Sequence, residues 1–340
     1  MKKYLSIAFA LCLALTLAAC AKNTESAAPT NTVSDKTASA VTQQADAAAD
    51  DKISIVTTIF PPYDFTRAIA GDKAEITMLL PPGAESHSFE PTPQDIIKIQ
   101  NCAVFIYNGG GSDVWVDDVL ESMDTSKMKI VKFIDCVEVV EEEIVEGMED
   151  EEESEELTEG EEEEPEYDEH VWTSPRNAKL IVQKISDTLC EADSSNAAAY
   201  KANAAAYITK LDELDAKFRA VVDSAARKTI VFGDRFPFRY FADAYGLNYF
   251  AAFPGCSTET EASAATVAFL IDKVKAEKIP VVFHIELSNA KMADTIAEGA
   301  GAKVLELHAC HNISKTDFEA GKTYIDFMAA NVDALREALQ

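Results

Sequence analysis

The sequence predicts an α/β protein in which two similar lobes are joined by a long, rigid helix. From Lys52 onward, short runs of β-branched residues alternate with segments of helical period, as expected when strands and helices follow each other. Between Asn196 and Ser224, large apolar residues recur near helical spacing. Residues 60–71, which begin Phe-Pro-Pro-Tyr, also resemble residues 236–246, which begin Phe-Pro-Phe-Arg, and both segments end in glycine. Because each segment follows the first strand of its half, we expect two similar lobes that face each other across a cleft.

The first lobe, residues 52–194, is predicted to alternate strands and helices. Pro81-Pro82-Gly83 and the run Gly109–Gly111 each follow a strand and end it. Ser174 can cap the free N–H groups of a helix, and Pro175 is preorganised for its first turn. The predicted strands are Ile53–Ile59, Ala74–Leu80, Cys102–Tyr107 and Lys129–Phe133. The first predicted helix begins with the segment Phe65–Ala70, the next follows Pro93, and another starts at Ser174-Pro175.

Residues 195–228 are predicted to form the linking helix, and residues 229–340 the second lobe. At about 1.5 Å per residue, a helix from Asn196 to Ser224 would run the length of a domain. The strands expected in the second lobe are Ile230–Phe232, Tyr249–Phe250, Val281–Phe283 and Lys303–Leu307, and the expected helices are Phe238–Ala244, Ala262–Ala276 and Met292–Ala300.

Residues 1–20 are predicted to be a lipoprotein signal peptide. Lys2 and Lys3 precede an apolar stretch, Leu5–Leu17, that is too short to span a bilayer. Small residues then lead to Cys20, in a pattern that resembles a bacterial lipobox. Cleavage there would leave the Cys20 thiol to carry membrane lipid, so we expect an exported protein anchored outside the cytoplasmic membrane or in the periplasm. An ordinary signal peptide is the alternative. Residues 21–51 lack aromatic side chains and are mostly small and polar, which predicts a flexible stalk.

The negative charge is concentrated in one segment. The 340 residues include 59 acidic and 30 basic ones, for a net charge of −29. Between Glu141 and Glu169, 19 of 29 residues are acidic and none is Lys or Arg, which leaves −10 for the rest. Because no basic surface is available to bind phosphate, we expect no nucleic-acid partner. The acidic loop, residues 141–169, either attracts cations transiently or is a solvated loop that self-repulsion keeps unfolded.

Two of the five histidines lie in loops that a following helix braces. His87 precedes Thr92-Pro93 and Asp95, which can cap and open a helix. His170 precedes the second helix start, Ser174-Pro175. Neutral imidazole is a common ligand of zinc and similar metals, so these two side chains could face one cleft and share a metal ion.

Three parts of the sequence resemble the zinc- and manganese-binding receptors of bacterial ABC importers, the cluster 9 solute-binding proteins. They are Glu85–Asp95, His170-Val171-Trp172 before its helix, and Tyr200, Asn203, Leu211 and Leu214 of the long helix. The resemblance extends from about residue 52 to the C-terminus. It implies two α/β lobes with one metal ion in the cleft between them, and delivery of that metal to a membrane permease. We expect the receptor to act as a monomer.

By this resemblance, His87 and His170 are the first two metal ligands. The last family ligand, usually an aspartate after a late strand of the second lobe, falls on His311. His308 lies close enough to that strand to be a packing residue. The remaining family ligand, a histidine or glutamate past the first strand of the second lobe, has no equivalent. Asp234 is predicted in its place, although Arg235 could equally hold that carboxylate in an ion pair.

Glu261, Glu286, His308 and a water molecule are the alternatives for this remaining position. Three histidines with a carboxylate or water suit four-coordinate zinc, whereas manganese favours more oxygen. The predicted cargo is therefore Zn²⁺, with Mn²⁺ as the alternative.

Five cysteines follow Cys20, and export permits disulfides. A bond between Cys256 and Cys310 would fix the loop that presents His311. Buried free thiols, or a Cys310 thiolate ligand, are the alternatives.

Two other classes of function compete with a non-catalytic metal receptor. An exported zinc hydrolase needs an open coordination position with a bound water, and neither His-Glu-x-x-His nor Gly-x-Ser-x-Gly occurs in the sequence. A surface adhesin is the other class, but no sequence feature specifies its partner. The sequence therefore favours a receptor that captures zinc and is not an enzyme.

Overall fold

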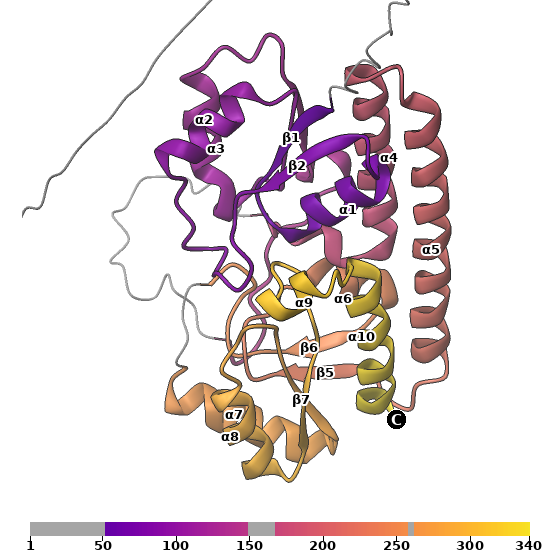
Figure 1. The fold of residues 1–340 in the computed structure, drawn as a ribbon. Coiled ribbons are helices and arrows are strands. Elements are labelled where there is room, and N and C mark those ends of the chain that lie inside the picture. The colour runs from indigo at the N-terminus through magenta and orange to yellow at the C-terminus, as the bar shows by residue number, and fades with distance from the viewer. Residues whose placement is uncertain (1–51, 149–166, 258–261) are drawn as a thin grey trace, which may run out of the picture. The chain divides into compact units, whose positions relative to one another are not determined.

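The structure, a computed structural model, describes residues 52–148, 167–257 and 262–340. The predicted signal peptide, the stalk and most of the acidic loop lie outside these residues. The described chain contains two parallel four-stranded sheets with helices packed around them (Figure 1). The predicted α/β fold of two similar lobes is confirmed. Across the described ranges, no helix is both long enough and apolar enough to cross a membrane.

The two sheets have the same topology. In each, the first strand pairs with the second on one side and with the third on the other, and all pairs are parallel. The orders are β2-β1-β3-β4 and β6-β5-β7-β8. Parallel strands end at one edge of a sheet, so the loops that follow them gather there. The strands are β1 (Ile53–Thr57), β2 (Ala74–Met78), β3 (Val104–Tyr107), β4 (Lys129–Lys132), β5 (Thr229–Phe232), β6 (Asn248–Phe250), β7 (Val281–His284) and β8 (Lys303–Glu306).

Helix α5 (Ala197–Asp223) is the predicted long helix. Its 27 residues extend about 40 Å at the usual rise per residue. It packs against α1 (Phe60–Ala70), α4 (Pro175–Ala192) and α10 (Tyr324–Leu339), and Figure 1 shows α4 and α5 side by side. Its buried side chains include the residues that define the predicted helical spacing: Tyr200, Ala204, Tyr207, Leu211, Leu214 and Phe218.

The remaining helices are shorter: α2 (Pro93–Asn101), α3 (Val114–Glu121), α6 (Arg239–Tyr245), α7 (Ala264–Glu277), α8 (Lys291–Ala300) and α9 (Lys315–Glu319). Helices α3, α9 and α10 are not among the predicted ones. Helix α10 nevertheless has a local signal, because Thr323 and Asp326 form a capping box at its start.

The predicted starts of three helices can be compared with the structure. Helix α1 begins at Phe60 rather than Phe65, because prolines in a first turn need no N–H partner. The capping box of Thr92 and Asp95 before α2 is present as predicted. Ser174 does stand at the start of α4, but its side chain makes no capping hydrogen bond.

One main hydrophobic core extends through both lobes. Ile55 and Phe65 of the first lobe, Ile230 of the second, Trp172 and Leu335 are all buried in the same cluster. Burial of each such side chain contributes about 1.5–3 kcal/mol to folding. The lobes are therefore joined by shared packing as well as by α5.

Candidate metal centre

Four side chains from loops of both lobes converge on one point. His87 lies between β2 and α2, Glu169 and His170 precede α4, and His311 follows β8. One ligand atom from each lies within 4.8 Å of the others. The ring centroids of His170 and His311 are 4.5 Å apart, and those of His87 and His311 are 5.3 Å apart. The three predicted histidines are thus brought together.

His170 is held by a carboxylate behind its ring. Its Nδ1 lies 3.0 Å from Asp168 Oδ1, which also accepts the His170 backbone N–H at 2.8 Å. With Nδ1 occupied, Nε2 is the atom His170 can offer, and it is buried without a hydrogen-bond partner. Burial acts to lower the pKa of His170, but the charge and hydrogen bond of Asp168, together with the charges of Glu169 and Glu142, outweigh it, and the pKa is raised. An imidazole backed by a carboxylate is a common arrangement at metal sites.

His311 presents a second unpartnered nitrogen. Its Nε2 is buried without a hydrogen-bond partner, and its ring packs edge-on to Trp172 at 5.0 Å. Glu286 fixes the loop, because its oxygens accept the backbone N–H groups of Ala309 at 2.6 Å and His311 at 2.8 Å. Between them, Cys310 has a left-handed backbone with φ 65°. Burial lowers the pKa of His311 well below its usual value, and the nearby imidazoles add to this.

His87 completes the group from the loop between β2 and α2. Its Nδ1 lies 2.9 Å from Ser112 Oγ, which leaves Nε2 as the atom it can offer. Burial, followed by the charges of His170 and Arg235, lowers the pKa of His87 to about 3. Because a ligating imidazole must be neutral, His87 needs no deprotonation to bind a metal at neutral pH.

Glu169 is the fourth member and was not among the predicted site residues. Its Oε2 accepts the Ser112 N–H at 2.8 Å, its Oε1 contacts Ser112 Oγ, and burial raises its pKa. The fit depends on glycine, since a Cβ at Gly110 would lie 2.5 Å from Glu169 Cβ. A carboxylate directly before His170 is the only sequence signal that points to Glu169.

Asp234 lies outside this group. Its two oxygens accept backbone N–H groups, from Arg235 at 2.9 Å and from Ile285 at 3.2 Å. These bonds hold the carboxylate within its own lobe, so the structure puts Glu169, rather than Asp234, beside the three histidines. Arg235 does not pair with Asp234 through its side chain, as the sequence analysis considered, but with Glu85.

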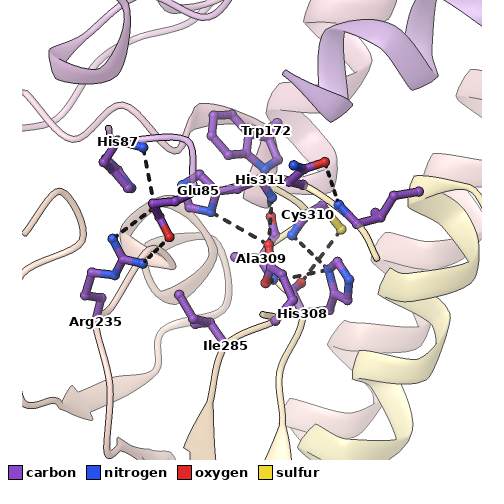
Figure 2. Close-up of polar contacts among 12 residues, drawn as sticks. Glu85, His87, Trp172, Arg235, Ile285, His308, Ala309, Cys310 and His311 are labelled. Carbon is purple, nitrogen blue, oxygen red and sulfur yellow. Dashed lines mark hydrogen bonds and ion pairs between the residues drawn. The ribbon is translucent and has the colours of Figure 1, made fainter. Parts of the chain in front are cut away.

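The other candidates for the remaining position have structural partners. His308 stacks on Phe327 with centroids 3.9 Å apart, and its Nδ1 accepts the Cys310 N–H at 3.0 Å (Figure 2). Glu286 serves the loop amides described above. Glu261 lies outside the described residues.

Cys256 and Cys310 are free thiols and form no disulfide with each other. Burial raises the pKa of each thiol well above its usual value, which disfavours a thiolate ligand. Of the alternatives considered for these cysteines, the structure contains the buried free thiols.

The donor set fits zinc. Three nitrogens and one carboxylate oxygen can fill a four-coordinate site, and zinc accepts both donor types at about 2.0–2.2 Å. The two unpartnered Nε2 atoms each cost free energy when buried alone, and a metal ion would offset that cost.

Comparison with known proteins places this geometry in a family. Residues 55–338 match the family described as zinc-uptake complex component A, periplasmic (ZnuA). The high-affinity zinc uptake system protein ZnuA of Bacillus subtilis (strain 168) is 36% identical over 289 residues, which are 85% of this chain and 88% of that protein.

Two further comparisons involve AdcA of Streptococcus pneumoniae. The zinc-binding lipoprotein AdcA of strain R6 is 34% identical over 289 residues, and the match covers 85% of this chain but only 56% of AdcA. The crystal structure of the Zn(II)-bound ZnuA-like domain of AdcA matches with a TM-score of 0.70 and 32% identity, over 85% of this chain and 99% of that domain. With a family match over most of its length, this chain belongs to the ZnuA family of solute-binding proteins.

Proposed function

We propose that this protein captures Zn²⁺ outside the cytoplasm and delivers it to the permease of an ABC importer. The observation that carries the proposal is the buried group of His87, Glu169, His170 and His311, in which two imidazole nitrogens lack partners. The names of its relatives, a zinc uptake protein and a zinc-binding lipoprotein, support zinc as the cargo.

His87, His170, His311 and Glu169 are the proposed ligands. Glu169 replaces Asp234 in this set because it adjoins the histidines, whereas the Asp234 oxygens accept backbone N–H groups. A set rich in nitrogen favours zinc over manganese, which prefers more oxygen.

The proposed receptor is not an enzyme. Metal-assisted hydrolysis needs an open coordination position for water, and four protein donors leave none in a tetrahedral site.

The N-terminal segments fit the same proposal. A signal peptide over residues 1–20 would direct export, and after cleavage lipid on Cys20 and a stalk over residues 21–51 would hold a monomeric receptor near its permease. Residues 52–194, 195–228 and 229–340 are the proposed first lobe, linking helix and second lobe.

Metal analysis of protein purified without added metal, followed by zinc titration against a chelator, tests this function. We expect one zinc per chain, with manganese at least roughly 100-fold weaker. His87→Ala and His170→Ala should each weaken zinc binding strongly. Zinc binding as tight as the parent's in the variant lacking both histidines would contradict the proposed site.

A further inference from the structure

Glu85 and Arg235 form an ion pair between the two lobes, beside His87. This side of the metal centre is called the mouth of the site. Glu85 lies in the first-lobe loop that carries His87, and Arg235 lies in the second-lobe loop after β5. Arg235 Nη1 and Nη2 donate to Glu85 Oε1 at 3.4 Å and Oε2 at 3.3 Å. Figure 2 shows the two side chains meeting beside His87.

The Arg235 side is held firmly in the second lobe. Its Nη1 donates to the Ser257 carbonyl at 3.0 Å, and its backbone N–H donates to Asp234, whose other oxygen accepts the Ile285 N–H. The guanidinium therefore reaches across the mouth from a braced position.

The Glu85 side is connected to the metal centre. Glu85 Oε1 accepts the backbone N–H of His87 at 3.4 Å. The same loop is bonded to the second lobe through Asn312, whose side-chain amide donates to the carbonyls of Pro81 at 2.7 Å and Ala84 at 2.9 Å. Movement of Glu85 away from Arg235 would thus move the loop that presents His87.

The space beneath the pair is small. A cavity of about 20 Å³ is bounded by Glu85, His87, Arg235, Leu287 and His311, among others. That is room for about one water molecule. A zinc ion with its hydration shell is larger than this space. The side chains of all four members of the group are nearly buried: His87 is 6% exposed, Glu169 1%, His170 0% and His311 9%.

We propose that Glu85 and Arg235 form a latch that controls how fast the metal exchanges, without being ligands themselves. This inference rests on the proposed zinc function. The Glu85 side chain is 48% exposed and the Arg235 side chain 14%. Water can therefore compete for the carboxylate, and the latch can open without unfolding either lobe.

The alternative is a purely electrostatic role, and it predicts opposite signs. The positive charge of Arg235 disfavours a bound cation, so its removal alone would slow zinc release. The negative charge of Glu85 favours a cation, so its removal alone would speed release. A latch predicts instead that either removal speeds both association and release, because the same barrier is crossed in both directions.

Stopped-flow zinc uptake, and release into excess chelator, should be measured for the parent, Glu85→Gln, Arg235→Gln and the double variant. We expect each single variant to speed both rates by about fivefold, the upper range for a partly exposed ion pair. The double variant should match the singles within about twofold, because one interaction is lost in all three. Glu191→Gln, which breaks the exposed Lys129–Glu191 pair within the first lobe, is the matched control.

Hydrogen exchange of the metal-free protein gives a second measurement. The Ala84 and Phe89 amides donate within the His87 loop, at 3.1 Å each, and should exchange faster in Glu85→Gln and Arg235→Gln than in Glu191→Gln. Opposite shifts in the release rates of the two single variants, or unchanged rates and exchange, would overturn the latch. A parent protein that binds no zinc would contradict the proposed function, and the exchange of these amides would still test the latch.

Discussion

Two of the contacts between the lobes differ in character. The inner contact is buried and consists of Trp172, Ala309, Tyr324 and Asp64. Trp172 Nε1 donates to the Ala309 carbonyl at 2.7 Å, Tyr324 donates to the Trp172 carbonyl at 2.8 Å, and the Tyr324 N–H donates to Asp64 at 3.0 Å. The mouth contact is the partly exposed pair of Glu85 and Arg235.

Because of this difference, the inner contact should keep the lobes together, whereas the mouth contact can open. A buried hydrogen-bonded group that loses its partner costs about 1–3 kcal/mol, whereas an exposed ion pair contributes about 0–1 kcal/mol because water replaces it. The inner contact should therefore persist in every state of the folded protein, while the mouth contact can break and re-form. His311 and His170 lie beside the inner contact, and His87 lies beside the mouth.

The largest effect is expected at Trp172. Trp172→Ala removes a fully buried ring and the bond to Ala309, and should lower the free energy of unfolding by about 4 kcal/mol. Chemical denaturation of the metal-free protein measures this. Trp172→Phe, which keeps most of the packing, should cost only about 1–2 kcal/mol. A stability for Trp172→Ala within 1 kcal/mol of the parent would show that the inner contact does not hold the lobes together.

The next effect concerns the second lobe's share of the metal site. His311 is the only group member from that lobe, so His311→Ala should weaken zinc binding by roughly 100-fold or more, as one of four donors is lost. His308→Ala should reduce affinity much less, because its ring stacks on Phe327 outside the group. Equal losses for both variants, measured by chelator competition, would contradict this assignment.

Much of this arrangement follows from the sequence. Alternating strand and helix patterns predict the paired sheets, and the apolar spacing of α5 predicts the long helix. Loops next to helix starts, together with the family resemblance, predict the three histidines of the metal centre.

The fourth group member does not follow from the sequence. Glu169 is one of 19 acidic residues in its segment, and its contacts with Ser112 and the close approach of Gly110 join segments that are distant in the sequence. Asp234 follows a strand as the family ligand does, but backbone amides of Arg235 and Ile285 occupy its oxygens. Such contacts between distant segments leave no periodic signal.

Groups behind the ligands should matter more at the inner side than at the mouth. Asp168→Asn removes the charge behind the buried His170 and should weaken zinc binding about tenfold, as expected for a residue that orients a metal ligand. Ser112→Ala removes the neutral hydroxyl beside His87, and its effect should be roughly threefold. Zinc titration of both variants tests the order, and a larger loss for Ser112→Ala would reverse the comparison.

Protons should compete with zinc mainly at His170, which lies beside the inner contact. The lowered pKa values of His87 and His311 leave both neutral at pH 6, whereas the raised pKa of His170 leaves it protonated in the metal-free protein near pH 6.5. Zinc must displace that proton, so affinity should fall as the pH drops through the raised pKa of His170, by at most about tenfold per pH unit. Burial raises the pKa of Glu169 as well, so this carboxyl is a second group that can carry a proton in the metal-free protein. Calorimetry in buffers of different ionisation enthalpy should find about one proton released per zinc near pH 6.5. Release of three would show that His87 or His311 also carries a proton.

The smallest effect is expected where the acidic loop begins, which forms a third connection to the second lobe. Glu142 accepts the Cys256 N–H at 3.0 Å, Glu143 accepts the Tyr249 hydroxyl at 3.0 Å, and a Cβ at Gly147 would lie 2.1 Å from Phe269. This part of the loop is therefore attached, although the charge pattern alone suggests a solvated segment. Glu142→Gln keeps an acceptor for Cys256 but removes the charge, so it should cost about 1 kcal/mol of stability or less. Because neither Glu142 nor Glu143 belongs to the metal group, zinc affinity should stay within about threefold of the parent's. Loss of tight zinc binding in Glu142→Gln would instead show that this connection is part of the metal site. Zinc binding would then depend on a third contact between the lobes, in addition to the inner and mouth contacts.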